Sequence, residues 1–266
     1  MILLVVSGAS RGFGQAVAAA FVKSSTTPIV AILTARSEQG LLETKDLMLT
    51  AASSTNTNSA NISIHPVDLG DLDKLESNLE ELIEAAKPFA QYERIVIVNN
   101  AGSLGHLGKA TDMTSLQDFS QIINLNVTSS LWFTTRWARE LSRNENVTIV
   151  NISSLCAVQA FPTMSTYCAG KAARDMFHES LAKEHPLLKI LNYAPGAMDT
   201  DMTVALREEE KLEDGIRDFF IGAHAKGELI DPKASAAKLV KLVLSGDYES
   251  GKHVDYWDVP DPINSD

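Results

Sequence analysis

Short apolar runs rich in β-branched residues alternate with longer amphipathic stretches along most of this 266-residue chain. Parallel strands need long crossover connections, and a helix that covers the sheet is the usual one. The alternation therefore predicts an α/β fold with a doubly wound parallel sheet of about seven strands and helices on both faces. The expected strands are Ile2–Ser7, Ile29–Thr34, Ile62–Pro66, Ile95–Asn99, Val147–Ile152 and Lys189–Tyr193. The expected helices include Gly14–Lys23, Leu72–Ala86, Leu116–Leu141 and Ser165–Glu184.

Two polar segments interrupt this pattern. Residues 50–61 form a low-complexity stretch that predicts a surface loop without chemistry. The charged stretch Arg207–Asp214 predicts a solvated helix face, with a mobile lid over a substrate cleft as the alternative. Neither segment is typical of an interdomain linker, so we expect one domain over residues 1–266.

Composition and charge exclude several classes of function. Hydrophobic residues make up 45% of the chain and charged residues 21%, which is ordinary for a globular protein with a buried core. The chain carries 23 basic and 34 acidic side chains, and nucleic acid or an anionic membrane would repel its formal net charge of −11. No apolar run approaches the ~18 residues of a membrane-spanning helix, and the start lacks the basic region of a signal peptide. Cys156 and Cys168 alone cannot build a disulfide scaffold or a four-ligand zinc site, so we expect a cytoplasmic protein without a metal site.

A glycine-rich turn, SGASRGFG, joins the first expected strand to the first expected helix. Glycines let the backbone turn tightly and approach a pyrophosphate, which sits on the amides at the helix N-terminus. Because the motif lies between a strand and a helix, we expect it to bind a dinucleotide, with a purely structural turn as the alternative. The expected cofactor contacts in this turn are Gly8, Ser10, Arg11, Gly12, Phe13 and Gly14.

The end of the second expected strand indicates which dinucleotide is bound. NAD-binding proteins place an Asp or Glu there, roughly 20 residues on, that accepts a hydrogen bond from the ribose 2′-OH. This chain has Arg36 followed by Ser37, and the guanidinium would attract a 2′-phosphate, with Arg11 helping from the glycine turn. The pattern favours NADPH; the alternative is that Arg36 only faces solvent at the start of a helix.

Three polar side chains are expected to converge at the carboxyl edge of the sheet. Tyr167 and Lys171 lie four residues apart, so on a helix they share one face. Ser154 lies 13 residues before Tyr167, at the end of the fifth expected strand. Hydride delivery to a carbonyl carbon creates an alkoxide that needs a proton from a positioned acid, and a nearby ammonium would lower the pKa of a tyrosine that supplies it. Each residue alone could be an ordinary packed or solvated side chain, but with the glycine turn they predict a carbonyl reductase.

These motifs resemble the short-chain dehydrogenase/reductase family, through the spacing G-x3-G-x-G and the pattern Ser, Tyr-x-x-x-Lys. The resemblance implies a Rossmann-type fold in which residues 1–102 mainly bind the dinucleotide and residues 103–260 carry catalysis and substrate binding. It implies that Asn126, otherwise a mid-helix polar residue, completes a catalytic tetrad by supporting a proton-relay water, and that Lys171 also binds the nicotinamide ribose. It further implies a homodimer packed through the expected helices Leu116–Leu141 and Ser165–Glu184. The other cofactor contacts it implies are Asp68, Leu69, Asn100, Ala101, Gly102, Met198, Thr200, Asp201, Met202 and Thr203.

Longer matches narrow the resemblance to a branch of that family that reduces pterin side-chain ketones with NADPH, late in tetrahydrobiopterin biosynthesis. The matching segments are SGASRGFG, NNAGSLG, NISSLCAVQ, YCAGKAARDMF and NYAPGAMDTDM. The substrate contacts that this implies are Ser154, Leu155, Tyr167, Gly196 and a pterin anchor at Asp255. A carboxylate suits the adjacent N–H donors of a 2-aminopyrimidinone edge, although Asp255 could also be an ordinary solvated side chain. The alternatives are a broad reductase of diketones, aldehydes or quinones, and a non-catalytic NADP-binding scaffold.

Overall fold

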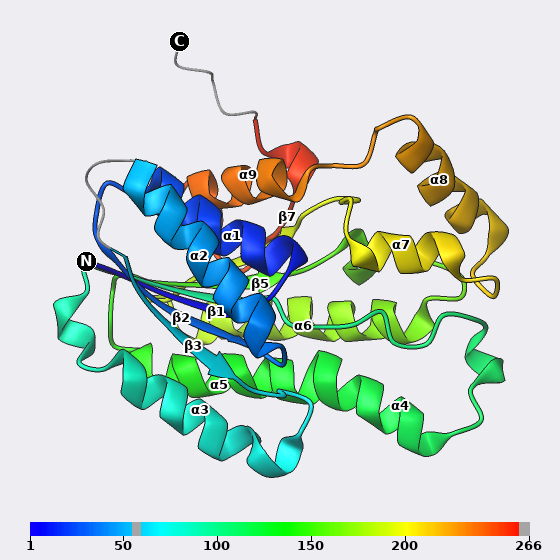
Figure 1. Ribbon diagram of the computed structural model, residues 1–266. Helices are drawn as coiled ribbons and strands as arrows, with labels where there is room; N and C mark the ends of the chain where they lie inside the picture. The colour runs from blue at the N-terminus through cyan, green and yellow to red at the C-terminus, as the bar shows by residue number, and fades with distance from the viewer. Residues whose placement is uncertain (55–59, 261–266) are drawn as a thin grey trace.

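Seven strands form one parallel sheet in the computed structural model, which describes residues 1–54 and 60–260 (Figure 1). The strand order β3-β2-β1-β4-β5-β6-β7 confirms the expected doubly wound α/β fold of the Rossmann type. The order reverses between β1 and β4, and ligands of such sheets bind at the carboxyl ends of the strands beside this point. The strands are β1 (Ile2–Ser7), β2 (Ile29–Ala35), β3 (Ala60–Pro66), β4 (Arg94–Asn99), β5 (Val147–Ile152), β6 (Lys189–Ala194) and β7 (His253–Asp255).

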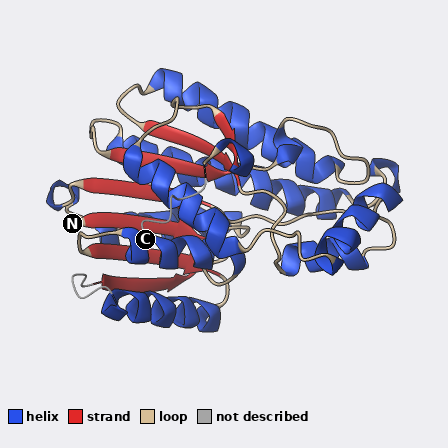
Figure 2. Ribbon diagram, turned by 90° about the horizontal axis from the view of Figure 1, so that it is seen from above, coloured by secondary structure: helices blue, strands red, loops and turns tan. Residues whose placement is uncertain are grey.

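Helices cover both faces of this sheet, and several lie beyond the carboxyl ends of the strands (Figure 2). Helices α1, α2 and α9 pack together on one face, while α3, α5 and α6 cover the other. The helices are α1 (Gly12–Ser24), α2 (Glu38–Ser54), α3 (Leu72–Ala86), α4 (Leu116–Ile123), α5 (Ser130–Leu141), α6 (Ser165–Glu184), α7 (Asp201–Glu208), α8 (Asp214–Ala225) and α9 (Pro232–Ser245). Two short turns matter for the site, the 3-10 turns η4 (Leu155–Ala157) and η5 (Tyr256–Asp258).

The central strand β1 divides the apolar core into two layers. Ile2, Leu4 and Val6 pack into the layer with α1 and α9, whereas Leu3 and Val5 pack into the layer with α3 and α5. Successive side chains of a strand point to opposite faces, so a strand that is apolar throughout needs cover on both sides. The unbroken apolar run at the start of the chain is therefore explained by the two helical layers.

The expected helix Leu116–Leu141 is interrupted. It consists of α4, a π-helical segment η3 (Asn124–Ser129) and α5, with Asn126 inside the π segment. A π segment inserts an extra residue into the helical turn, and such segments are common at functional sites. The apolar periodicity of the sequence did not reveal this local widening.

The two polar segments also differ from expectation. Helix α2 continues to Ser54 and β3 begins at Ala60, so the ends of the predicted 50–61 loop are helix and strand, and its middle lies outside the described residues. The charged stretch 207–214 is the end of α7, a turn and the first residue of α8, not a helix face, and Leu212 in the turn is buried. The apolar side chain of Leu212 packs in the cluster around Tyr167 and so holds this connection against it.

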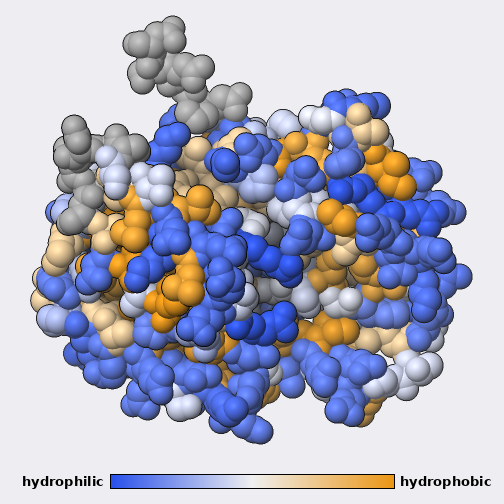
Figure 3. All heavy atoms as spheres, in the orientation of Figure 1, coloured by the Kyte–Doolittle hydropathy of each residue, from blue (hydrophilic) through white to orange (hydrophobic). Residues whose placement is uncertain are grey.

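Hydrophilic side chains cover most of the surface visible in Figure 3, with hydrophobic patches between them, including some beside α8. Phe219 and Ile221 of α8 are among the exposed large apolar side chains. Within the described part of the chain, no helix has the length and apolar character needed to cross a bilayer.

Candidate active site

The glycine turn after β1 is wound so tightly that only glycine fits at several positions. Gly8 has φ of 66° and Gly12 has φ of 56°, in the left-handed region that other residues adopt only at a cost. A Cβ atom at Gly14 would overlap the carbonyl oxygen of Gly8. The expected backbone turn is therefore present between β1 and α1, and its shape depends on these three residues.

Neighbouring segments hold this turn in place. Asn100, just after β4, donates from Nδ2 to the carbonyl oxygens of Ser7 (3.0 Å) and Gly8 (3.1 Å). Thr44 of α2 donates from Oγ1 to the carbonyl of Ala9 (2.8 Å). The backbone amide of Ala101 donates to Ser7 Oγ (3.1 Å). The Asn100-Ala101 segment thus supports the turn directly, whatever else it contacts.

The turn also lies against the start of α7. A Cβ atom at Gly12 would be 3.8 Å from Cγ2 of Thr200, the residue that caps the N-terminus of α7. Arg11 Nη1 lies 2.7 Å from Asp201 Oδ2 in an exposed ion pair. Such a backbone cradle without side chains, at the N-terminus of α1, fits a pyrophosphate. The structure thus brings together the predicted contacts of the glycine turn and of the 200–201 segment.

Arg36 and Asp68 border one cleft of about 720 Å³ at the carboxyl ends of β2 and β3. Both side chains are exposed, and Ser103 lines the same cleft. Ser37 caps α2 by accepting a hydrogen bond from the amide of Gly40 at 3.1 Å. Arg36 is therefore available to an anion at this edge, whereas Arg11 is engaged by Asp201.

Two apolar residues of the predicted cofactor set lie in the core. Phe13 is 6% exposed and stacks on Tyr193 with a centroid separation of 6.2 Å. Leu69 is 5% exposed and packs in the layer that covers the other face of the sheet. Only the backbones of these residues remain available for a cofactor.

Tyr167, Lys171 and Ser154 converge at the carboxyl end of β5. Tyr167 and Lys171 lie on one face of α6, with Lys171 Nζ 5.6 Å from the centre of the Tyr167 ring. Lys171 Nζ donates a 2.6 Å hydrogen bond to the carbonyl of Ile152, the last residue of β5. Ser154 follows two residues later, and its Oγ accepts a hydrogen bond from the amide of Cys156 at 3.2 Å. The spacing therefore places the phenol, ammonium and hydroxyl groups together as expected.

The pKa values of this group differ from the sequence-based expectation. Burial raises the pKa of Tyr167, and the Cys156 thiol raises it further, while a hydrogen bond with Ser154 and the charge of Arg174 act in the opposite direction. Burial, followed by the charge of Arg174, lowers the pKa of Lys171 well below its ordinary value. The Tyr167 pKa is thus raised and not lowered as expected, because Tyr167 packs in an apolar cluster with Met164, Leu206 and Leu212. Tyr167 is a protonated phenol at neutral pH in this structure.

Asn126 lies behind these groups and is held at both ends of its amide. Its Oδ1 accepts from the amide of Ser103 (2.8 Å), and its Nδ2 donates to the carbonyl of Ser103 (3.0 Å). A Cβ atom at Gly102 would be 3.2 Å from Asn126 Oδ1. Asn126 therefore ties the π segment to the Gly102-Ser103 backbone, and its relay role stays a prediction.

The segment after β6 curves over the site. Gly196 has φ of 78°, and a Cβ atom there would overlap the side chain of Ile230. Thr203 Oγ1 donates to the carbonyl of Met198 (2.8 Å) and accepts from the amide of Thr200 (3.1 Å), which closes the N-terminus of α7. The sulfur of Met202 lies 3.9 Å from the Tyr167 hydroxyl. Helix α7 thus places an apolar, polarisable side chain against the phenol.

The predicted substrate contacts Leu155 and Asp255 lie at the same edge of the sheet. Leu155 follows Ser154 and is 45% exposed. Asp255 ends β7, opposite Ala194 of β6, and its Oδ1 accepts from the amide of Trp257 at 3.1 Å. The carboxylate thus caps η5 with one oxygen and is partly exposed, next to the 75% exposed side chain of Trp257.

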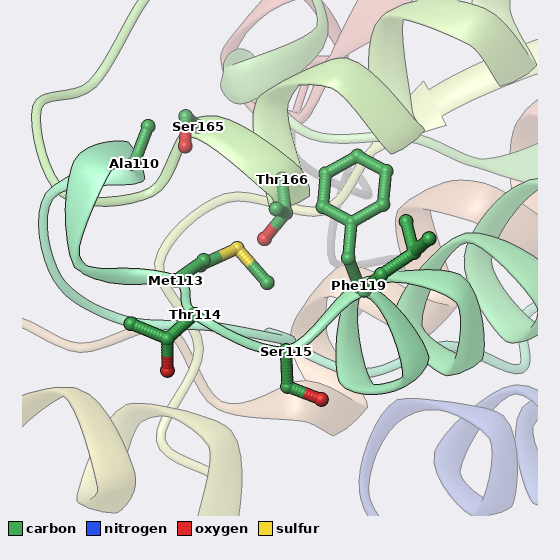
Figure 4. A pocket seen from close by; sticks show the side chains of 8 residues that line it. Ala110, Met113, Thr114, Ser115, Phe119, Ser165 and Thr166 are labelled. Carbon is green, nitrogen blue, oxygen red and sulfur yellow. The ribbon is translucent and has the colours of Figure 1, made fainter.

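A smaller pocket of about 340 Å³ opens beside the start of α6 (Figure 4). Met113, Phe119 and Thr166 line it, and Met113 also borders the larger cleft. Thr166 precedes Tyr167, so this pocket borders the first turn of α6. The sequence analysis assigned no functional residue to the 110–119 segment, because this segment contains no recognisable motif.

Sequence reasoning also missed a row of polar side chains beneath the site. Asn99, Asn151, Asn192 and His253 occupy paired positions on β4, β5, β6 and β7, and we call them the polar row. The three asparagines are at most 1% exposed. Neighbouring Asn151 and Asn192 are joined by a 2.9 Å hydrogen bond between their side chains. Only strand register brings these distant residues together, so no local motif could have indicated the row.

Comparison with known proteins shows which family has this arrangement. The family model described as short chain dehydrogenase matches residues 3–211. The chain belongs to the short-chain dehydrogenase family. The sepiapterin reductase of Rattus norvegicus is 36% identical over 263 residues, which cover 96% of each chain. A benzil reductase of Bacillus cereus that forms (S)-benzoin is 27% identical over 255 residues, which cover 94% of this chain and 96% of that enzyme.

Solved structures of short-chain dehydrogenases share the fold. A short-chain dehydrogenase/reductase from Saccharomyces cerevisiae superposes with a TM-score of 0.78 at 24% identity, covering 96% of this chain and 95% of that one. Membership of the short-chain dehydrogenase family makes this protein an oxidoreductase that acts on CH–OH or C=O groups, with NAD or NADP as its cofactor.

Proposed function

We propose that the protein is an NADPH-dependent carbonyl reductase whose preferred substrate is a pterin with a side-chain ketone, as in sepiapterin. The observation that carries the chemistry is the convergence of Tyr167, Lys171 and Ser154 at the carboxyl end of β5. The glycine turn follows β1, and β4 lies between β1 and β5 in the sheet, so the turn is on the other side of the point where the strand order reverses. A non-catalytic scaffold has no need of this combination.

The residues have distinct roles in this proposal. NADPH, when bound, supplies the hydride that reduces the carbonyl carbon. Ser154 donates a hydrogen bond to the carbonyl oxygen and holds it against Tyr167. Tyr167 donates its phenolic proton to the developing alkoxide, since burial keeps the phenol protonated. Lys171 stabilises the resulting phenolate and binds the nicotinamide ribose, and Asn126 supports the water that returns the proton.

The other cofactor contacts belong to the same proposal. The backbone of the glycine turn and the Thr200 cap would hold the pyrophosphate, and Arg36 would bind the 2′-phosphate from the rim of the 720 Å³ cleft. Asp68 would contact the adenine at the same cleft. Arg11 would reach the phosphate only after leaving Asp201, its partner in this structure.

Asp255 supports the pterin assignment. Its carboxylate is partly exposed at the same edge of the sheet, and the neighbouring Trp257 offers a flat apolar surface for an aromatic ring. The 36% identity to the rat sepiapterin reductase over nearly the whole chain agrees with this assignment. The polar 2-aminopyrimidinone edge of the pterin would donate to the carboxylate.

Reduction of an apolar diketone is the second candidate. The Tyr167 phenol is surrounded by apolar side chains, including Met202, and Leu155 beside Ser154 is exposed. Such surroundings would accept aryl groups without a carboxylate anchor. The resemblance to the benzil reductase of Bacillus cereus agrees with this alternative.

The two candidates separate when NADPH consumption is followed with sepiapterin and with benzil. We expect the wild-type protein to prefer sepiapterin, and Asp255→Asn to lower kcat/KM for sepiapterin about 10- to 100-fold by removing a charged hydrogen bond. The asparagine retains an acceptor for the amide of Trp257, so η5 stays capped. Reduction of benzil by this variant should be nearly unchanged.

Asp247→Asn is the matched control, because it makes the same change at an exposed position after α9. It should leave both activities unaltered. Equal losses toward sepiapterin and benzil in Asp255→Asn would show that Asp255 is no pterin anchor. Turnover of benzil alone would move the second candidate to first place.

The homodimer packed through Leu116–Leu141 (α4, η3 and α5) and α6, the cytoplasmic location and the single domain stay predictions. Exposed apolar side chains on these helices, Trp132 and Met176, are consistent with a covered face.

A further inference from the structure

Arg174 is a fully buried cation on the helix that carries the site. It is 1% exposed, and its guanidinium donates three hydrogen bonds to neutral oxygen atoms. Nη2 donates to the carbonyl of Asn99 (2.6 Å), Nη1 to the carbonyl of Ala101 (3.0 Å) and Nε to Oδ1 of Asn151 (2.8 Å). Burial of an arginine is costly, and these bonds go to groups that no lysine or apolar residue could satisfy together.

The residue after it, Asp175, binds the same polar row. Its Oδ1 accepts from Asn151 Nδ2 (2.9 Å), and its Oδ2 lies 2.7 Å from His253 Nδ1. His178, one turn further on, contacts the carbonyl of Arg174 through Nδ1 (2.8 Å) and Thr134 of α5 through Nε2 (2.9 Å). One stretch of α6 is therefore bonded to the sheet and to α5 by directional contacts.

Two partners of Arg174, Asn99 and Ala101, connect it to the proposed site. Asn99 and Ala101 flank Asn100, which holds the glycine turn through Ser7 and Gly8. Gly102 lies between the guanidinium and Asn126, since a Cβ atom at Gly102 would be 3.6 Å from Arg174 Nη1 and 3.2 Å from Asn126 Oδ1. Lys171 lies three residues before Arg174, on the same face of α6.

From these contacts we propose that Arg174 is a positioning residue for carbonyl reduction, which fixes Tyr167 and Lys171 against the cofactor-binding turn and supplies a second buried positive charge beside them. The inference rests on the proposed function, because it concerns the same reaction. It assigns to Arg174 no contact with substrate or cofactor. The guanidinium acts through α6 and through the Asn99–Gly102 backbone.

The charge has a direct effect on the proposed acid. Arg174 is the second-largest cause, after burial, of the lowered pKa of Lys171, and it also lowers the pKa of Tyr167 against the effect of burial. Its removal would raise the pKa of both groups. The ionisable groups that face Arg174 and Tyr167 are Lys171, Cys168, Asp175 and His178 of α6, Cys156 of η4 and, through Asp175, His253 of β7.

Two substitutions separate position from charge. Arg174→Met keeps the apolar stem but removes the charge and all three hydrogen bonds, whereas Arg174→Lys keeps the charge and cannot span the three acceptors. We expect Arg174→Met to lower kcat for the better of sepiapterin and benzil about 100-fold, the effect of misplacing reacting groups by about 1 Å. Arg174→Lys should lower kcat less. Fluorescence titration with NADPH should show weaker binding in both variants, because the Asn99–Gly102 backbone supports the glycine turn.

The pH profile is the readout that a merely structural role would not move. In the reverse reaction, oxidation of the alcohol formed from the better substrate, the rate rises with pH as Tyr167 becomes the phenolate base. Loss of the nearby charge raises the pKa of Tyr167, so this rise should move to higher pH in Arg174→Met. It should stay in place in Arg174→Lys and in the control Lys183→Met, which removes an exposed charge from the same helix.

The outcomes decide the inference. Wild-type kcat and an unmoved pH profile in Arg174→Met would overturn it, and so would a profile that moves equally in Arg174→Lys. Thermal melting shows whether the variants fold. If Arg174→Met does not fold, a wild-type kcat in Arg174→Lys would overturn the positioning role. Tyr167→Phe distinguishes failure of this inference from failure of the proposed function. If Tyr167→Phe keeps its activity, Tyr167 is not the proton donor, and the proposed function itself fails.

Discussion

Replacement of Tyr167 by phenylalanine is expected to lower kcat for carbonyl reduction about 1,000-fold, the size of effect typical when a general acid is removed. The substitution deletes only the hydroxyl group, which contacts Ser154 and lies 3.9 Å from the sulfur of Met202. The ring would keep its place among Met164, Leu206 and Leu212. Steady-state rates with sepiapterin and benzil at saturating NADPH measure the loss.

Tyr92→Phe provides the matched control for this substitution. Tyr92 is 5% exposed and lies in the apolar layer with α3 and α5, far along the chain from Tyr167. Its loss of a hydroxyl should leave kcat unchanged. NADPH binding and the melting temperature of Tyr167→Phe should match the wild type, and a kcat within tenfold of the wild-type value would remove Tyr167 from the role of proton donor.

Replacement of Arg36 by aspartate is expected to reverse the cofactor preference. The kcat/KM ratio of NADPH to NADH should fall about 1,000-fold, because a charged hydrogen bond to the 2′-phosphate is lost and a carboxylate gains the ribose 2′-OH. Arg36 is exposed at the rim of the cleft, so the change does not disturb the core. The measurement compares initial rates with the two cofactors at several concentrations of each.

Arg143→Asp changes the net charge of the protein by the same amount at an exposed position after α5. It should leave the cofactor ratio unaltered, which separates a local contact from the general field of an acidic protein. A ratio in Arg36→Asp that equals the wild-type ratio would assign phosphate recognition to another group. Arg11 would then be the next residue to test, since its ion pair with Asp201 is exposed to solvent.

Local patterns were sufficient to predict much of the fold. The apolar runs of β1, β2, β4 and β5 needed helical cover on both faces, and the order of the sheet confirms that architecture. The spacing of Tyr167 and Lys171 predicted their common face, because helical geometry alone determines it. The glycine turn was also predictable from a local pattern, because its backbone conformation requires glycine at three positions.

Features that depend on distant pairing were not predictable. The ion pair of Arg11 with Asp201 joins residues 190 positions apart, and Arg174 meets partners 23, 73 and 75 positions away. The raised pKa of Tyr167 was not predictable either, because it results from burial of the phenol by Leu206 of α7 and by Leu212 in the turn after α7. The continuation of α2 through a polar sequence shows the same limit, since tertiary packing of an amphipathic face overrides weak local preference.

The polar row gives the helix beneath the site a unique registration on the sheet. A helix that rests on apolar side chains alone can slide by one turn, about 5.4 Å, and exchange one set of van der Waals contacts for another. Helix α6 cannot do so, because every other registration would leave the Arg174 guanidinium buried without its three acceptors and would break the bonds of Asp175 with Asn151 and Asn192. The segments that surround the substrate, from α7 to η5, can therefore diverge in sequence and shape while the tyrosine keeps its position.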